Sequence, residues 1–158
     1  MKWMTAIAAM GTNRVIGDGE RIPWHLPEDL RWFKEKTMDG AMLMGRKTFD
    51  AIGGALPGRE TFVVSRGADI PKVHMVRDLE NFDPAISERP FYVCGGGEIY
   101  RQTMHRCSDV LITLVNLAPS GKTLMPVFEN DFRLIATLRE TPEFSILHYR
   151  AASLILCE

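Results

Sequence analysis

The sequence has few cysteines and no excess of charge of either sign. Its three cysteines, Cys94, Cys107 and Cys157, are widely spaced and form no CxxC pair. This pattern excludes a disulfide framework and indicates reduced thiols, as in a cytoplasmic protein. The 19 Lys and Arg residues nearly balance the 20 Asp and Glu residues, for a net charge of -1. We therefore expect no general attraction to nucleic acid or to an anionic membrane.

Long apolar runs and clusters of metal ligands are also missing. No stretch approaches the roughly 20 apolar residues of a membrane-spanning helix. The apolar segment 3–10 is short and leads directly into 13–17, so we expect a buried first strand there rather than a signal peptide. The four histidines are scattered, and we predict no metal site. With 158 residues and no repeat or linker, the chain is expected to form a single domain, 1–158.

Strand-like and helix-like segments alternate up to about residue 117. The strand-like runs are 3–10, 41–44, 60–65, 73–76 and 90–94, and the helical candidates are 27–36, 46–52, 78–86 and 97–105. This alternation predicts a largely parallel sheet with about four helices on its faces. Further strand-like runs are 109–117, 132–140 and 144–156. The break between the last two is short enough for an antiparallel hairpin, so we expect an α/β fold with a mixed, mainly parallel eight-stranded sheet.

A carboxylate lies among apolar residues at the start of the helix expected at 27–36. Leu26, Leu30, Phe33 and Thr37 recur at helical spacing and define an inward face. Asp29 falls on or beside that face. An Asp in the first turn also favours the helix dipole, so a purely structural role stays open. Because no basic residue shares the face, a flat heterocycle with paired N–H donors would suit the carboxylate.

Two turns between a strand and a helix are candidate phosphate sites. Residues 45–48 combine a glycine with basic and hydroxyl side chains, and residues 95–97 are three consecutive glycines. Free backbone N–H groups at such helix starts can bind phosphate, although each turn taken alone is more often a plain turn. Ser65 and Arg66, at the end of another strand, would suit an additional phosphate, or form a solvated turn.

Taken together, these motifs closely resemble those of dihydrofolate reductase in its bacterial single-domain form. The shared segments are 7–9, 14–17, 22–30, 44–48, 56–59, 95–100 and 121–123. Their order and spacing together are specific, whereas each segment by itself occurs by chance.

The resemblance implies hydride transfer from NADPH to C6 of dihydrofolate with protonation of N5. The product, tetrahydrofolate, supplies one-carbon metabolism and thymidylate and purine synthesis. By this resemblance the catalytic residues are Asp29, Ile22, Trp24 and Thr113. The substrate-binding residues are Ile7, Ala8, Leu30, Phe33, Ile52, Leu56, Arg59, Cys94 and Tyr100. Asp29 would bind the 2-amino group and N3 of the pterin with the support of Thr113, and Arg59 would pair with the α-carboxylate of the glutamate tail.

The resemblance also assigns the cofactor residues. These are Ala9, Ile16, Gly45, Arg46, Lys47, Thr48, Ser65, Arg66, Gly95, Gly96, Gly97, Glu98 and Ile99. Arg46, Ser65 and Arg66 match positions that bind the 2'-phosphate, so we expect a preference for NADPH over NADH. The family also has a cis peptide bond at the position of Gly95–Gly96.

Two residues depart from the family pattern. Lys122 stands where several bacterial members have an Asp that accepts hydrogen bonds from the mobile loop matched by 17–22, and an ammonium group cannot accept them. We predict that Lys122→Asp would alter hydride-transfer or product-release rates. Glu98 stands where some relatives have an Arg near the cofactor phosphates, which leaves more of the 2'-phosphate recognition to Arg46 and Arg66.

Two other functions remain as alternatives. The NADPH-dependent reductase of riboflavin synthesis has the same fold, but it lacks the helix-borne Asp matched by Asp29 and the Arg59 motif. A non-catalytic nucleotide-binding module would account for the phosphate turns, though not for a pterin pocket. We expect a monomer whose partners are dihydrofolate and, where present, antifolate inhibitors. Inhibitor affinity would depend on Ile22, Leu30, Phe33, Ile52 and Cys94.

Overall fold

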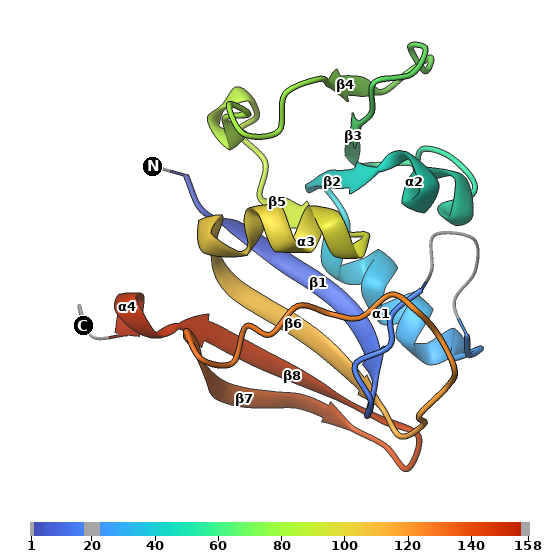
Figure 1. Ribbon diagram of the computed structural model, residues 1–158, viewed down its shortest axis with the longest axis vertical. Helices are drawn as coiled ribbons and strands as arrows, with labels where there is room; N and C mark the ends of the chain where they lie inside the picture. The colour runs from blue at the N-terminus through green and yellow to red at the C-terminus, as the bar shows by residue number, and fades with distance from the viewer. Residues whose placement is uncertain (1, 18–22, 156–158) are drawn as a thin grey trace.

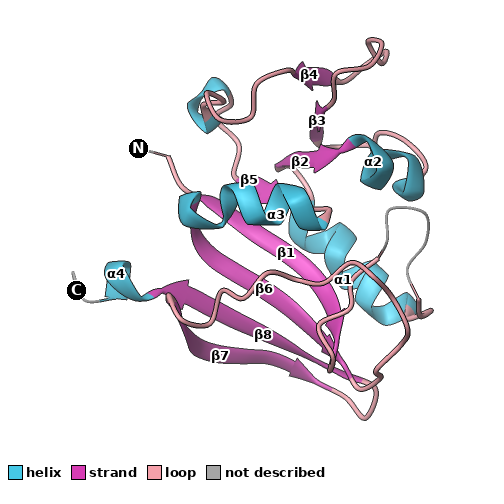
Figure 2. Cartoon of the chain, in the orientation of Figure 1, coloured by secondary structure: helices cyan, strands magenta, loops and turns pink. Residues whose placement is uncertain are grey.

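One eight-stranded sheet organises the residues that this computed structural model describes, 2–17 and 23–155 (Figures 1 and 2). Its strands are β1 (Met4–Gly11), β2 (Ala41–Gly45), β3 (Glu60–Val64), β4 (His74–Val76), β5 (Phe91–Val93), β6 (Cys107–Val115), β7 (Phe132–Glu140) and β8 (Phe144–Ala151). Their order across the sheet is β4-β3-β2-β5-β1-β6-β8-β7. The first strand of the chain thus lies near the centre, between two strands formed much later in the sequence.

Strand directions confirm a mixed, mainly parallel sheet. β1 pairs in parallel with β5 and β6, β2 with β3 and β5, and β3 with β4. β8 is antiparallel to both β6 and β7. The tight connection between β7 and β8 closes with a hydrogen bond of 2.8 Å from the Thr141 N–H to the Phe144 carbonyl. The expected C-terminal hairpin is therefore present.

The helices cover both faces of the sheet. They are α1 (Pro27–Thr37), α2 (Arg46–Ile52), α3 (Gly97–Thr103) and α4 (Ala152–Ile155), with short 3-10 turns at Pro84–Ile86 and Met104–Arg106. Alternate residues of β2 separate the two faces. Met42 packs in the cluster that includes Phe33 of α1 and Phe49 of α2, whereas Leu43 packs in the cluster that includes Ile99 of α3. Thus α1 and α2 lie on one face and α3 on the other.

The prediction of a helix at 78–86 is wrong. The chain there forms turns, with Asn81 donating to the Asp78 carboxylate, and only the 3-10 turn at Pro84–Ile86 is helical. Asp83 caps that turn by accepting the Ala85 N–H at 2.9 Å. Short polar side chains compete for backbone hydrogen bonds, and a proline cannot donate one, so the apolar spacing did not produce a helix.

The last strand is also shorter than expected. We expected a strand over 144–156, but β8 ends at Ala151 and the chain continues as α4. Ala151 is already opposite Phe132, the first residue of β7, and Arg150 is opposite Asp109 of β6. The Ala152 N–H still donates to the Asp131 carbonyl at 2.9 Å, but β7 begins only at Phe132, so the ladder on that side ends here and the chain leaves the sheet. No helix of the described chain is long and apolar enough to cross a membrane.

Candidate functional site

A cavity of about 550 Å³ opens beside the carboxyl ends of β1 and β5. Its walls come from the end of β1, the inner side of α1, parts of α2 and the segment after β5. From β1 the chain runs to β2, β3 and β4 on one side of the sheet, with β5 added later between β2 and β1, whereas β6 lies on the other side of β1. The strand order therefore reverses around β1. Open α/β sheets bind ligands at such a reversal, outside the carboxyl ends of the strands.

Asp29 is the acidic residue of this cavity. Pro27 occupies the first turn of α1, where its missing N–H costs nothing, and this start brings Asp29 to face Thr113 of β6. The Thr113 hydroxyl donates to Asp29 Oδ1 at 2.6 Å. Burial raises the pKa of Asp29, and this hydrogen bond opposes the rise. The neighbouring Glu28 instead points away to an exposed ion pair with Arg139 at 3.0 Å.

The rest of α1 supplies an apolar wall. Leu30 and Phe33 line the cavity on one side, facing Ile52 and Leu56 from α2 and the segment after it. Leu30 was expected on the buried face but is 49% exposed, because it borders the open cavity rather than the core. Among the described residues Asp29 forms no ion pair, so its carboxylate has acceptor positions left for a ligand that brings N–H donors.

A tyrosine and a thiol stand on the opposite side of the cavity. The Tyr100 hydroxyl donates to the Ile7 carbonyl at 2.7 Å and is fully enclosed. Burial raises the pKa of Tyr100 well above its usual range, so the hydroxyl stays protonated and holds the end of β1 against α3. Burial likewise raises the pKa of the Cys94 thiol to about 12. Neither group is poised to act as a nucleophile at neutral pH.

The two candidate phosphate turns lie next to each other. Gly45 precedes α2 and Gly96 precedes α3, and no side chain of the described residues caps either helix start. The Gly45 N–H donates to the Gly95 carbonyl at 2.9 Å, which joins the two turns. The peptide bond between Gly95 and Gly96 is cis, as expected. A Cβ on Gly96 would meet the Thr48 hydroxyl at 3.8 Å, so this hydroxyl at the start of α2 lies close to the start of α3, and both residues line the cavity.

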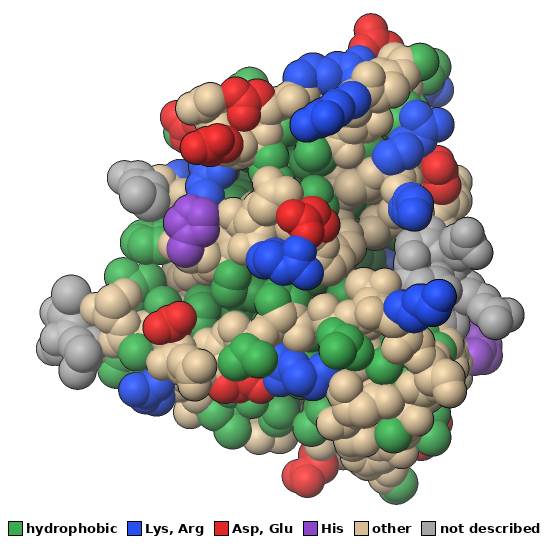
Figure 3. Space-filling view, in the orientation of Figure 1, with side chains coloured by type: hydrophobic (Ala, Val, Ile, Leu, Met, Phe, Trp, Pro, Cys, Tyr) green, Lys and Arg blue, Asp and Glu red, His purple; other side chains and the backbone are tan. Residues whose placement is uncertain are grey.

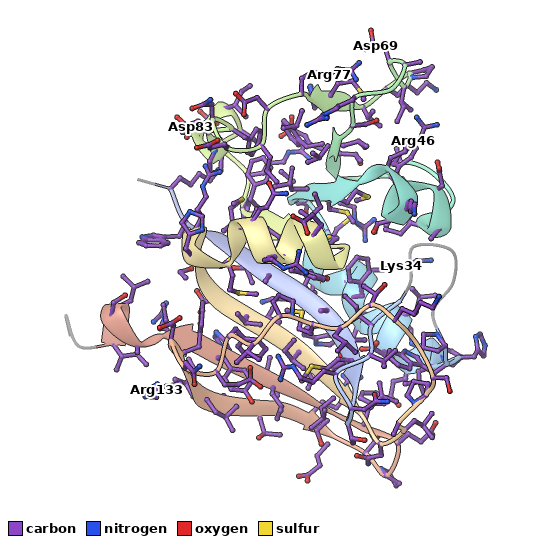
Figure 4. The ribbon with its side chains drawn as sticks, in the orientation of Figure 1. Lys34, Arg46, Asp69, Arg77, Asp83 and Arg133 are labelled. Atoms are coloured by element: carbon purple, nitrogen blue, oxygen red, sulfur yellow. The ribbon has the colours of Figure 1, made fainter. Side chains whose placement is uncertain are left out.

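Basic side chains gather around these turns and the β3–β4 connection. Figure 3 shows Lys and Arg side chains concentrated on this upper part of the molecule, and Figure 4 labels Arg46 and Arg77 there. Arg46 pairs with Asp50 at 3.2 Å on α2, while Ser65 accepts the Gly67 N–H at 3.0 Å. These residues are exposed or half-exposed, so an anionic ligand can reach them.

Comparison with known proteins agrees with this arrangement. The family model for dihydrofolate reductase matches residues 3–150. The type A13 dihydrofolate reductase of Escherichia coli is 38% identical over 136 residues, covering 83% of this chain and 82% of the relative. Dihydrofolate reductase HdrB of Haloferax volcanii is 35% identical over 157 residues, covering 90% and 80%.

The chain belongs to the dihydrofolate reductase family. A solved structure of the family, dihydrofolate reductase from Enterococcus faecalis complexed with NADP(H) and RAB-propyl, has a TM-score of 0.83 at 25% identity. The match covers 95% of this chain and 96% of that one. The eight-stranded fold and its orientation of helices are therefore those of the family.

Most residues expected at the dihydrofolate reductase site line the cavity. These are Ile7, Ala8, Ala9, Ile16, Trp24, Asp29, Leu30, Phe33, Thr48, Ile52, Leu56, Cys94, Gly95, Gly96, Tyr100 and Thr113. Gly45, Arg46, Lys47, Ser65, Arg66, Gly97, Glu98 and Ile99 lie outside its lining, around the two helix starts and the β3–β4 connection. Ile22 lies outside the described residues, as does most of the loop expected to meet Lys122.

Arg59 and Glu98 also have partners within the chain. The Arg59 guanidinium donates to the carbonyls of Lys34 and Pro57 and to the Thr37 hydroxyl, so it joins the end of α1 to the loop after α2. It lies outside the cavity lining, although Lys34 is part of that lining. Glu98 is paired with Arg101 on α3, which satisfies its charge locally.

Sequence reasoning missed Lys34 and Arg77. Lys34 follows Phe33 on α1 and is part of the cavity lining. Figure 4 labels it on α1. Arg77 lies just after β4 and donates to the Ser65 carbonyl at 2.8 Å. The pairing of β3 with β4 brings it there, and no local spacing could have indicated it.

Proposed function

We propose that this chain reduces 7,8-dihydrofolate to tetrahydrofolate with NADPH as hydride donor. The observation that carries the proposal is a half-buried carboxylate, Asp29, held by Thr113 in a ligand-sized cavity that adjoins two uncapped helix starts. One acidic anchor suits a pterin, and the helix starts suit the phosphates of a dinucleotide. Membership of the dihydrofolate reductase family supports the same reaction.

Asp29 is the residue that recognises the substrate. Its two oxygens accept hydrogen bonds from the 2-amino group and N3 of the pterin, while Thr113 holds one of them in place. The negative charge stabilises the form of the substrate that is protonated at N5, and the proton itself arrives through water. Phe33, Ile52 and Leu56 exclude bulk water from the remaining surface of the ring and the benzoyl group, which strengthens this electrostatic effect.

The cofactor residues present fit NADPH. The phosphates would rest on the free N–H groups of 46–48 and 96–99, and the glycines let a ligand approach the backbone closely. Arg46, Ser65 and Arg66 would bind the 2'-phosphate, which predicts a preference for NADPH over NADH. Bound there, NADPH supplies the hydride for C6 of the pterin. Ala9 and Ile16 would orient its carboxamide through their backbone groups.

The alternatives fit the site less well. A reductase of riboflavin synthesis has no need of an acidic anchor on α1, and a non-catalytic nucleotide-binding module has no need of the apolar wall beside it. Burial disfavours the ionised form of Asp29, so its charge lowers the stability of the folded protein. A carboxylate kept in such a place is typical of a functional group. We further propose that the chain acts as a single-domain monomer in the cytoplasm. Its described cysteines are free, in keeping with a reducing compartment.

The test is NADPH oxidation in the presence of dihydrofolate, followed by absorbance, with NADH in parallel. We expect turnover that favours NADPH, and a loss of about 100-fold or more in Asp29→Asn because the charge that stabilises the protonated substrate is gone. The loss should ease at low pH, where the substrate is protonated without help.

Glu28→Gln is the matched control, since it neutralises the adjacent carboxylate on the same helix, which faces solvent. It should stay within about two-fold of the wild type. A wild-type protein that binds NADPH and leaves dihydrofolate unchanged would show that the substrate is a different one. Equal losses in Glu28→Gln and Asp29→Asn would show that Asp29 has no special role.

A further inference from the structure

Arg14 joins two segments that are far apart in the sequence. Its guanidinium donates from Nε to the Met125 carbonyl at 3.0 Å and from Nη2 to the Pro126 carbonyl at 2.8 Å. The same group forms a two-point ion pair with Glu129, at 2.5 and 3.1 Å. It also lies over the ring of the buried Phe128, 5.7 Å from its centroid.

The positive charge of Arg14 is balanced by the negative charge of Glu129. Burial raises the pKa of Glu129, but the hydrogen bonds from Arg14 and from the backbone N–H of Phe128 outweigh burial and hold it below the usual value. The side chain of Arg14 is only 25% exposed. Its donors are thus engaged within the protein, and it is not among the residues that line the cavity.

The backbone conformation of Arg14 is an unusual one for this residue type. Its φ is +71°, in the left-handed region that favours glycine and asparagine. An arginine at such a position indicates that the contacts of its side chain offset the cost of the backbone. Neighbouring backbone bonds complete the junction: the Met125 N–H donates to the Arg14 carbonyl at 2.8 Å, and Val15 bridges to Leu124.

The junction reaches the cavity through Ile16. The Ile16 N–H donates to the Thr123 carbonyl at 3.0 Å, and Ile16 itself lines the cavity. A Cβ on Gly97, at the start of α3, would meet Thr123 at 3.1 Å and Ile16 at 3.9 Å. Ile16, Thr123 and the start of α3 therefore meet at one point. A shift of the segment that Arg14 holds would displace Ile16 relative to the start of α3.

We propose that Arg14 is a positioning residue for the nicotinamide half of the cofactor. It holds segment 123–129 against residues 14–16, and thereby fixes the backbone of Ile16 beside the cofactor. This inference rests on the proposed function, in which Ile16 orients the carboxamide. Arg14 does not touch the ligand, so its effect passes through the placement of Ile16. The adenosine half, bound by Arg46, Ser65 and Arg66, lies outside its influence.

Calorimetric titration with two ligands tests this inference. One ligand is NADPH, and the other is adenosine 2',5'-bisphosphate, which contains the 2'-phosphate and lacks nicotinamide. Arg14→Met keeps the length of the stem without its donors, and Arg14→Asn suits the left-handed backbone, so their shared effect is not one of backbone strain. In both variants we expect the Kd for NADPH to rise about ten-fold and the Kd for the bisphosphate to stay within about two-fold.

Two further variants complete the design. Arg106→Met removes another part-buried guanidinium, which within the described chain donates to the backbone carbonyls of Leu79 and Phe82, away from the cavity lining. It should leave both dissociation constants within about two-fold of the wild type. Glu129→Gln keeps a hydrogen-bond acceptor and weakens the ion pair, so a smaller rise for NADPH alone is expected even if both Arg14 variants fail to fold.

The outcomes separate the two claims. Wild-type turnover of dihydrofolate tests the proposed function before any variant is made. Unchanged NADPH affinity in folded Arg14 variants, or in Glu129→Gln where those variants do not fold, would overturn the positioning role. An equal loss for both ligands would also overturn it, because a general structural defect is not confined to the nicotinamide half.

Discussion

The hydrogen bond between Thr113 and Asp29 offers a sharp test of how the acidic anchor works. Thr113→Val removes the hydroxyl and keeps the size and the β-branched shape of the side chain, so β6 and its pairing with β1 should persist. Thr113 is 2% exposed, so water has little access to the space that its hydroxyl occupies. The substitution therefore isolates one donor to one carboxylate oxygen.

The size of the effect follows from the geometry. At 2.6 Å the contact is a short hydrogen bond to a charged acceptor, a type that contributes about 1.5–3 kcal/mol. Asp29 borders an open cavity, so water or the ligand can replace part of the interaction, and we expect the lower end of this range. A loss of about 1.4 kcal/mol corresponds to about ten-fold in kcat/KM for dihydrofolate.

The pH profile supplies a second signature. The hydroxyl favours the ionised form of Asp29 and opposes the rise in pKa caused by burial. Without it the pKa of Asp29 rises further, so activity that needs the carboxylate is lost at a higher pH as the solution is acidified. Steady-state kcat/KM across pH for the wild type, Thr113→Val and Thr113→Ser measures both effects. Equal activity in the valine and serine variants would refute the role of the hydroxyl, since serine retains it.

Three further predictions concern stability and reactivity. The pKa of Asp29 is higher in the folded protein than in the unfolded chain, where it is near 3.8. As the pH rises above 3.8, the unfolded chain therefore loses this proton before the folded protein does, and the free energy of unfolding falls. At pH 7, Asp29→Asn should thus unfold at a higher denaturant concentration than the wild type. This difference should disappear below about pH 3.8, where the carboxyl group is protonated in both states. Burial raises the pKa of the Cys107 thiol to about 12 and leaves the residue 1% exposed, so a protein with Cys94→Ser and Cys157→Ser should show no fast thiol in Ellman's assay at pH 8 until it is unfolded. Ile146→Ala, at a fully buried position, should lower the free energy of unfolding by about 2–5 kcal/mol in urea titrations, and a change below that range would mean that the core refills the space.

Local signals in the sequence were sufficient for much of the fold. The helix at 46–52 lies where it was expected, and α1 extends one residue beyond the expected 27–36. Proline at the first turn and the apolar spacing after it act within a few residues, so they can be read from the chain. The same reasoning failed at 78–86, because hydrogen bonds accepted by the Asp78 and Asp83 carboxylates outcompeted a weak apolar pattern.

The site was predictable only where its residues lie in motifs. Asp29 was noticeable because a carboxylate stood among apolar residues at helical spacing, and the glycine turns because they joined a strand to a helix. Arg77 carried no such signal, since its position beside Ser65 depends on how β3 pairs with β4. Arg59 was expected to bind substrate, and its hydrogen bonds to Lys34 and Pro57 could not be foreseen from the sequence.

The sequence by itself determined the class of fold, the family and the chemical types of the site, because composition, turns and motifs are local properties of the chain. Tertiary structure decided which of these residues meet. Asp29 and Thr113 are 84 positions apart and are joined by a contact of 2.6 Å, which exists only because α1 packs across the face of β6. Arg14 and Glu129 are 115 positions apart and meet where the segment after β1 contacts the segment between β6 and β7. Such distances in sequence are closed by strand order and helix packing, and no spacing along the chain encodes them.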